Sequence, residues 1–439
     1  MRSRSALLGL AIGLALADSS VVTLALPDIL REFDVGLTTV AWVLTSYNLV
    51  LALAAVPAAY VARRRPREAF VAGELLFAAS SLVCGLAPSF GVLVGARCFQ
   101  AAGGALVVTA ALDLLLETTG DELRAARVWA ASGVAGAALG PAAGGILTEL
   151  FGWQAIFFAQ VPLALAPLAA VRGFTARPLR APAGRPHIGA NAALLLLSGG
   201  LVAALFLLVL LLVNGWGMSP AAAGIVVTVM PLAALGAPRL LGPGETPVIR
   251  SATGDVLVAG GLAGLALLPH AGWWWTIPPQ LLVGAGLGLA LAALTERAVA
   301  GRAEQVVHGG WTLAARHAGV VLGLLLLAPI FTSALDRNAT EAERAGTAAV
   351  LDSRIPPLDK LKLAQDVLDE VDRADGAVPQ VEPVFASRPE TSEYHSLQSA
   401  LQDQLDRAVT DAFSEPFFLA ALLALAALIP VAATRGEPL

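Results

Sequence analysis

The chain has 439 residues, of which 57% are hydrophobic and only 14% are charged, and its mean hydropathy is +0.73. A soluble domain is closer to half apolar and a quarter charged, so this excess predicts a protein that lies in a lipid bilayer. The net charge of −5 argues against a nucleic-acid partner, and two cysteines are too few for a disulfide framework. The sequence contains no cluster with metal-ligand spacing and no phosphate-binding loop, so we expect no metal, no cofactor and no enzymatic activity.

Hydrophobic stretches of about 20 residues alternate with short polar breaks, as expected for helices that cross about 30 Å of hydrocarbon. The first stretch follows Arg2 and Arg4 and resembles a signal peptide, but it continues to Pro27 and is long enough to span. We therefore interpret it as a retained first span. The predicted fold class is an all-α membrane protein with about twelve transmembrane helices, at 6–27, 38–61, 69–88, 90–117, 128–150, 154–171, 190–213, 220–239, 253–269, 276–295, 306–333 and 413–433.

Basic residues gather in the loops on one side of these spans. The short loops on the other side contain a single one, Arg31. By the positive-inside rule, this bias predicts that both termini are cytoplasmic in a multi-pass protein of a bacterial inner membrane. The residues that establish it are Arg63, Arg64, Arg65, Arg67, Arg124, Arg127, Arg172, Arg177, Arg180, Arg185, Arg239, Arg250, Arg297, Arg302 and Arg435.

A linker at 172–189, rich in Arg and Pro, divides the spans six and six. This is the layout of two six-helix bundles with a substrate path between them. We predict an N-terminal bundle at 1–171 and a C-terminal bundle whose spans seven to eleven occupy 190–333. The last span and a cytoplasmic tail follow at 413–439.

The segment 334–412, between spans eleven and twelve, contains sixteen acidic and eight basic residues. Apolar residues recur at three- and four-residue spacing at 358–371 and 394–412, which predicts two amphipathic helices. The topology places this insertion outside the cytoplasm. It either caps the outer mouth as a helical hairpin or serves as a conduit or docking arm for an extracytoplasmic partner.

Five motifs occur in order along the chain: 18–27 (DSSVVTLALP), 42–47 (WVLTSY), 97–105 (RCFQAAGGA), 136–145 (GAALGPAAGG) and 316–319 (RHAG). Together they resemble the motifs of drug:proton antiporters of the major facilitator superfamily. The nearest branch comprises multidrug and lipophile exporters that usually have fourteen spans. The resemblance implies the major facilitator fold and export, with the proton gradient as the energy source.

One loop departs from that family's pattern. Between spans two and three, Ala58 and Ala62 stand where the family has Gly and Asp, whereas Arg63 matches. The resemblance therefore implies a cytoplasmic gate at Arg63 whose latch differs from the usual one or is weaker.

Three polar side chains of the first half lie at similar depth. Counted from the outer ends of their spans, Asp18, Tyr47 and Arg97 lie about 12–14 Å deep. Burial opposes ionisation of a carboxyl group and a nearby Arg favours it, so a carboxyl between the two can load and release a proton. We interpret Asp18 as the coupling acid and Arg97 as its modulator; the alternative is a static ion pair that orders the bundle.

Glu74 and Asp113 form a second candidate pair for proton coupling, because each lies about five residues inside the cytoplasmic end of its predicted span. They are equally well explained as side chains near the interface that reach water. We assign the remaining polar positions in the spans to the substrate pathway: Tyr47, Asn48, Gln100, Gln160, Thr228 and Arg316. For Arg316, the alternative is that it reaches the cytoplasmic surface.

Small residues follow one face of the fifth span, at Gly136, Gly140 and Gly144, with Gly145 beside them and Pro141 as a possible bend. Such a face allows another helix to approach closely. It indicates tight packing at least, and a hinge at the boundary between the bundles as the functional interpretation.

Taken together, these patterns predict a proton-coupled exporter of hydrophobic or amphipathic small molecules that contacts membrane lipid. Export of lipids or lipid-like glycoconjugates is an alternative that suits the long insertion. A sensor or scaffold that resembles a transporter but moves nothing is the alternative from another class.

Overall fold

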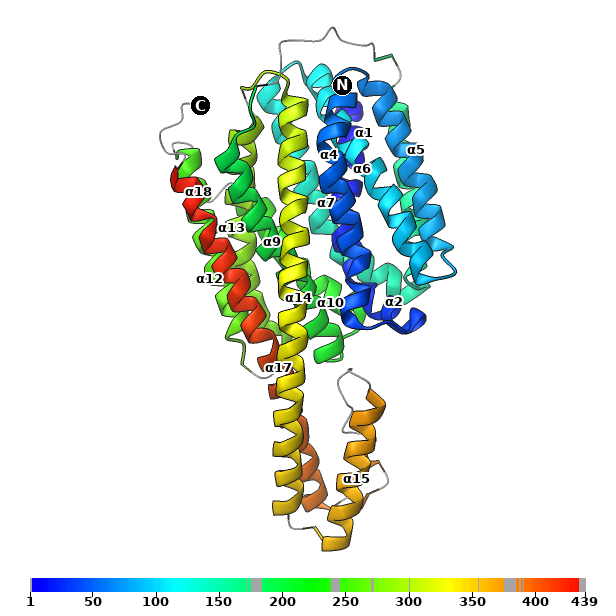
Figure 1. Ribbon diagram of the computed structural model, residues 1–439, viewed down its shortest axis with the longest axis vertical. Helices are drawn as coiled ribbons and strands as arrows, with labels where there is room; N and C mark the ends of the chain where they lie inside the picture. The colour runs from blue at the N-terminus through cyan, green and yellow to red at the C-terminus, as the bar shows by residue number, and fades with distance from the viewer. Residues whose placement is uncertain are drawn as a thin grey trace.

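Figure 1 shows the computed structural model, in which long helices run roughly side by side and a slender projection extends from one end. The structure describes residues 2–171, 173–174, 184–237, 245–269, 272–299, 301–353, 355–374, 384–386, 388–389 and 391–433. Eleven of the helices described there are long and apolar enough to cross a membrane, and a further apolar stretch, Pro220–Gly236, is shorter. Most of the linker predicted at 172–189 lies outside the described residues.

The N-terminal bundle contains six long helical segments. It consists of α1 (Arg2–Thr23), α2 (Leu26–Phe33), α3 (Leu37–Val40), α4 (Trp42–Ala62), α5 (Pro66–Gly85), α6 (Phe90–Thr119), α7 (Glu122–Phe151), α8 (Gln154–Leu165) and the 3₁₀ turn η1 (Ala166–Val171). The principal packing pairs are α5 with α6, α1 with α7 and α4 with α6.

The C-terminal bundle repeats this arrangement. It consists of α9 (Ile188–Leu210), η2 (Leu211–Gly215), α10 (Pro220–Val227), α11 (Val229–Gly236), α12 (Pro247–Ala266), η4 (Trp273–Thr276), α13 (Ile277–Val299), α14 (Gln305–Asp352), α15 (Pro357–Ala374), α17 (Ser392–Ala426) and α18 (Leu428–Ala433). Its strongest packing pair is α12 with α13, the counterpart of α5 with α6.

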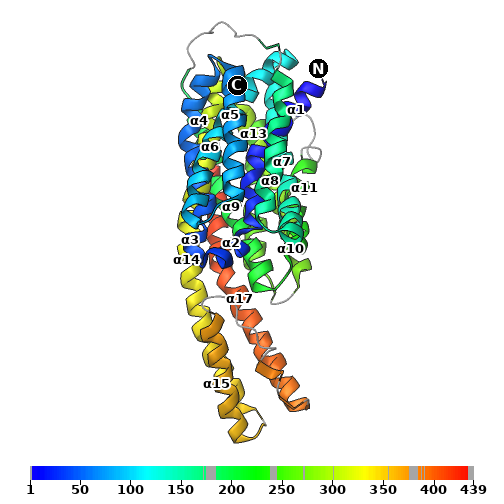
Figure 2. The ribbon, with the colours of Figure 1, turned by 90° about the vertical axis from the view of Figure 1, so that its right-hand side faces the viewer.

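Helix α1 begins and α18 ends at the same end of the molecule, which we call the termini face (Figures 1 and 2). The opposite end, from which α14, α15 and α17 extend, is the projection face. The first span ends at Thr23 and not at Pro27, because a turn follows and Pro27 lies in the first turn of the short helix α2. Proline has no backbone N–H to donate, so it starts a helix more readily than it continues one.

The projection is formed largely by the spans themselves. Helix α14 continues past the apolar segment to Asp352, and α17 runs unbroken from Ser392 into the last span. In the described residues, the predicted helix at 358–371 is α15 and the one at 394–412 is the first part of α17, while the end of α14 is a helical extension that the sequence did not predict. A small apolar core joins them, consisting of Val350, Ile355, Leu363, Val384, Phe385, Tyr394, Leu397 and Leu401.

Each bundle contains a close helix crossing, between α5 and α6 in the N-terminal bundle and between α12 and α13 in the C-terminal bundle. A Cβ atom built on Gly73 of α5 would lie 2.8 Å from the carbonyl oxygen of Gly103 in α6. A Cβ atom on Gly254 of α12 would lie 2.5 Å from the carbonyl oxygen of Gly286 in α13. Only glycine allows backbones to approach this closely. Because the same type of glycine contact occurs in both bundles, the two bundles pack alike at this crossing.

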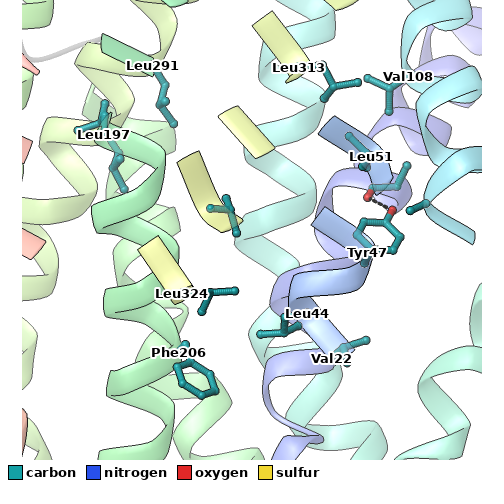
Figure 3. Close-up of a cluster of buried hydrophobic side chains, with 14 of the residues drawn as sticks. Val22, Leu44, Tyr47, Leu51, Val108, Leu197, Phe206, Leu291, Leu313 and Leu324 are labelled. Atoms are coloured by element: carbon teal, nitrogen blue, oxygen red, sulfur yellow. Dashed lines mark hydrogen bonds between the residues drawn. The ribbon is translucent and has the colours of Figure 1, made fainter. Parts of the chain in front are cut away.

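Apolar side chains from both halves meet along α14. Figure 3 shows Leu197, Phe206 and Leu291 from the C-terminal bundle on one side and Val22, Leu44 and Leu51 on the other, with α14 between. All of them are buried. The contact between the bundles is therefore mainly apolar, and the few polar groups within it stand out as candidates for function.

Candidate functional site

An ion pair lies completely buried inside the N-terminal bundle. Nη1 of Arg97, on α6, contacts Oδ2 of Asp18, on α1, and neither side chain is exposed to any extent. This confirms the predicted proximity of the two residues. Because α1 ends at Thr23, however, Asp18 lies five residues from its end, which places it closer to the projection face than predicted.

Other groups complete the surroundings of the guanidinium. Its Cζ lies 4.2 Å from the centre of the Tyr47 ring, and its Nε donates to the carbonyl oxygen of Val43 over 3.2 Å. The Tyr47 hydroxyl donates to the carbonyl oxygen of Ala15 over 2.8 Å (Figure 3). Tyr47 thus stacks on Arg97, a geometry that stabilises a buried cation, and it is not among the residues that line the central cavity.

Two glutamines close the network into a ring. Nη1 of Arg97 donates to Oε1 of Gln100 over 2.6 Å, and Nε2 of Gln100 donates to Oε1 of Gln160 over 2.8 Å. Nε2 of Gln160 then donates to Oδ1 of Asp18 over 2.8 Å. Both carboxylate oxygens of Asp18 therefore have donors. Gln100 and Gln160 belong to this ring and are not among the residues that line the central cavity, so their assignment to the substrate pathway remains a prediction.

A cavity of about 120 Å³ lies between the two bundles. Its walls are mostly apolar, and its polar groups include Ser19, Ser20, Asn48, Arg316 and His317. Drug-sized ligands occupy pockets of about 300–1,000 Å³, so the cavity in this structure is smaller than such a site. Asn48 and Arg316 thus line the cavity between the bundles, and their role in a substrate pathway remains a prediction. Arg316 faces the cavity and not the cytoplasmic surface.

One polar contact within the cavity joins the bundles. Nδ1 of His317, on α14, lies 2.7 Å from Oδ1 of Asn48, on α4. Nδ2 of the same amide donates to the carbonyl oxygen of Leu44 over 2.7 Å and to Oγ of Ser19 over 3.1 Å. This pattern identifies the Asn48 oxygen as the acceptor, so Nδ1 of His317 carries the hydrogen.

The termini face is closed by an ion pair that the sequence did not predict. Nε of Arg63, directly after α4, lies 3.6 Å from Oε2 of Glu304, directly before α14. Beside it, a Cβ atom on Gly310 would lie 2.6 Å from Cβ of Ala59. Arg63 thus has an acidic partner in the other bundle, although Ala62 stands where the family has an acid. A partner distant in the sequence cannot be identified from a loop motif.

A second contact closes the projection face. Oε2 of Glu149, near the end of α7, accepts a hydrogen bond from the backbone N–H of Ala221 over 2.9 Å. Ala221 lies in the first turn of α10, whose N–H groups have no partner within the helix. The bundles are thus joined at both faces.

The small residues of α7 divide between two neighbours. Cβ atoms on Gly136, Gly140 and Gly144 would clash with α1, which lies in the same bundle. The inter-bundle contact is made by Gly145, against the carbonyl oxygen of Pro220, and by Pro141, against Gly224. The stripe of three glycines is accordingly a packing face, and the predicted hinge remains a prediction for Pro141 and Gly145.

The other predicted positions lie outside the ring and the central cavity. Glu74 is buried and its Oε1 has no hydrogen-bond partner among the described residues. Its neighbour Gly73 on α5 packs against Gly103, Leu106 and Val107 of α6, and the predicted pairing of Glu74 with Asp113 remains a prediction. The hydroxyl of Thr228 donates to the carbonyl oxygen of Gly224 between α10 and α11 and is not among the cavity-lining residues.

Asp255 was missed by sequence reasoning. It is completely buried on α12, and neither carboxyl oxygen has a hydrogen-bond partner within the described part of the chain. The predicted span began at 253, which put Asp255 at the interface, whereas α12 begins at Pro247. The signal was available: Pro66 precedes Glu74 by eight residues, just as Pro247 precedes Asp255.

The described residues contain no group of three or more His, Cys, Asp or Glu side chains that could hold a metal ion. The chemistry of the site consists of proton-binding and hydrogen-bonding side chains.

Comparison with known proteins identifies the family. The family model described as "Major Facilitator Superfamily" matches residues 8–351. The chain belongs to the major facilitator superfamily. It is therefore a multi-pass membrane transporter and not an enzyme.

Relatives of this transporter include several proteins named for drug efflux. It is 36% identical over 159 residues to the multidrug resistance protein Stp of Mycobacterium tuberculosis. The matched stretch covers 35% of this chain and 30% of Stp. It is also 36% identical over 220 residues to the tetracenomycin C resistance and export protein of Streptomyces glaucescens, covering 48% of this chain and 40% of that protein. The matched stretches thus span less than half of these relatives.

The fold agrees with a solved structure. A bacterial homologue of the human lysosomal transporter Spinster, in an inward-facing and unoccupied conformation, superposes with a TM-score of 0.64 at 14% identity. The superposition covers 100% of this chain and 99% of that chain. At this identity the likeness shows the major facilitator fold alone.

The ion pair at the termini face gives a first prediction. We expect Arg63→Gln or Glu304→Gln to raise the population opened at that face about two- to fivefold, because a partly exposed pair contributes about 0.5–1 kcal/mol. The measurement is the thiol-labelling rate at Ser198→Cys, in the cavity wall, in a chain that lacks Cys84 and Cys98. The charge exchange Arg63→Glu with Glu304→Arg should restore the slow rate. Unchanged labelling in both single variants would exclude the pair as a latch.

Proposed function

We propose that this transporter is a proton-coupled antiporter that exports hydrophobic or amphipathic small molecules. The observation that carries the proposal is the position of Asp18. Its carboxylate belongs to the buried ring with Arg97, while the next two residues of α1, Ser19 and Ser20, line the central cavity. Proton binding and substrate binding thus act on adjacent residues of one helix.

The chemistry of this coupling follows from the ring. Protonation of Asp18 removes the negative charge opposite Arg97, so the ion pair that joins α1 to α6 weakens. A substrate in the cavity contacts the same turn of α1 and favours one position of that helix. Two ligands that bias one element in opposite directions exchange for each other, which is the requirement of antiport.

The direction of transport rests on the relatives and on charge. Proteins with partial similarity are named as resistance, efflux or export proteins, which supports export. The distribution of arginines supports a cytoplasmic termini face and an outward projection. Export then moves substrate from the termini face to the projection face.

A specific observation favours a second candidate substrate, a membrane lipid. The far end of the projection exposes Leu351, Leu358 and Leu361, each by more than 60%. Exposed leucines at the tip of an otherwise acidic segment suit contact with an apolar partner or with lipid in transit.

One experiment tests the proposed function and compares the two substrates. Purified protein in detergent, in a weakly buffered solution with a pH-sensitive dye, is mixed with a panel of soluble amphiphiles and of lipids. An antiporter is expected to release protons on binding its substrate, with a release that saturates. Saturable release by soluble amphiphiles but not lipids supports drug-type export, and the reverse supports lipid export. Binding without proton release would contradict antiport.

A further inference from the structure

We propose that the central cavity binds its substrate through an anionic group held by the guanidinium of Arg316. This inference rests on the proposed function and names the substrate class: an apolar molecule with one carboxylate, sulfate or phosphate group.

Arg316 lies deep within the transporter. It is eleven residues from the start of α14 at Gln305, or about 16 Å along the helix axis. Its side chain lines the cavity between the bundles. A guanidinium stays protonated under all ordinary conditions, so this position places a permanent positive charge inside the apolar part of the molecule.

No acid of the described chain compensates this charge. None of the cavity-lining residues is Asp or Glu. The nearest acid in the ring, Asp18, is already bound by Arg97 and Gln160. Glu304, directly before α14, pairs with Arg63 at the termini face.

The contrast between the two buried arginines is informative. Arg97 has an aspartate, a glutamine and an aromatic face around it, whereas Arg316 faces the cavity with no ion-pair partner among the described residues. An uncompensated charge within a membrane-spanning segment costs several kcal/mol, and such residues mark ligand or ion pathways. A ligand that brings its own negative charge removes that cost.

The remainder of the cavity defines the rest of the ligand. Its walls include Leu201, Leu205, Met230, Leu287 and Val320, which suit an apolar body. Arginine presents paired N–H groups in a planar fork that matches two oxygens of a carboxylate or phosphate. The cavity therefore combines one anion-binding group with apolar walls, and it repels a lipophilic cation.

The test compares probes that share one alkyl chain with a fluorophore at its end. They carry a carboxylate, a phosphate, an alcohol or a trimethylammonium group, and binding to the purified full chain is measured by fluorescence. We expect the carboxylate or the phosphate to bind about tenfold or more tightly than the alcohol and the cation, because charge-assisted hydrogen bonds contribute about 1.5–3 kcal/mol. The two anionic probes separate a fatty-acid-like ligand from a phosphate headgroup, and inorganic phosphate is added as a competitor.

Arg316→Gln is expected to abolish the preference for anions and leave alcohol binding unchanged. Arg316→Lys should retain part of it, which keeps the test decisive if the Gln variant folds poorly. Arg31→Gln, which removes an arginine whose side chain is 73% exposed, serves as the matched control and should behave as wild type. Binding needs no proton gradient, so this result stands whether or not transport is proton-coupled.

Three outcomes would overturn the proposal. The first is tighter binding of the trimethylammonium probe than of either anion by wild type. The second is an anion preference that survives in Arg316→Gln. The third is displacement of the probes by inorganic phosphate at equal concentration, which would show a site for free anions and not for amphiphiles.

Discussion

Asp18→Asn is expected to abolish proton-driven transport, because Asn cannot bind and release a proton. In proteoliposomes with an imposed proton gradient, the variant should not concentrate a substrate that wild type concentrates. Asp28→Asn is the matched control, since Asp28 pairs with exposed Arg31 within α2, outside the ring. Gradient-driven accumulation by Asp18→Asn would exclude Asp18 as the coupling acid.

The structure adds an expectation about the stability of this variant. The sequence alone predicts that Asp18→Asn folds normally, but the ring leaves Arg97 with a buried, uncompensated charge when Asp18 is neutral. Removing one partner of a buried pair typically costs about 3–5 kcal/mol. We therefore expect a lower melting temperature for Asp18→Asn and recovery in the double variant with Arg97→Gln. The double variant should regain stability and remain uncoupled, which separates the two roles.

Gly145→Ala is expected to stop transport without unfolding the protein. A Cβ atom at this position would lie 2.2 Å from the carbonyl oxygen of Pro220 in α10, so the two bundles could not close at the projection face. The bundles can separate there, because the contact joins two bodies that each retain their own core. The measurement is substrate transport together with the distance between spin labels on the ends of α7 and α10, which should increase.

The adjacent glycine provides the control. A Cβ atom on Gly144 would lie 2.2 Å from the carbonyl oxygen of Val21 in α1, within the same bundle. That bundle cannot open, so the overpacking in Gly144→Ala should lower the free energy of unfolding by about 1–3 kcal/mol. The melting temperature should fall accordingly. If Gly145→Ala transports as wild type does, or if both variants merely unfold, the contact with α10 does not control closure.

Several features could be predicted from the sequence because they depend on local properties. Hydropathy averaged over 20 residues located the spans, and the rise of an α-helix placed Asp18, Tyr47 and Arg97 at comparable depth. The motifs at 18–27 and 136–145 indicated the superfamily that the family model confirms. Each of these inferences needs only the residues of a single span.

Other features depend on how helices rotate about their axes and on which helix lies beside which. Gln100 and Gln160 were assigned to the substrate pathway as polar positions, yet their side chains join the ring around Asp18 and Arg97 and do not line the central cavity. Glu304 approaches Arg63 although 241 residues separate them in the chain. Because one residue turns a helix by about 100°, small differences in packing decide whether a side chain meets lipid, a neighbour or the cavity.

The uncompensated charge of Arg316 illustrates the same division. The sequence by itself determined that an arginine lies three turns into span eleven, where a charge is costly. Only the tertiary structure decided that it faces the cavity between the bundles, that no Asp or Glu lines that cavity, and that Asp18 and Glu304 pair with other arginines. The physical reason is that hydropathy and helical rise act within one segment, whereas compensation of a buried charge depends on distances between segments.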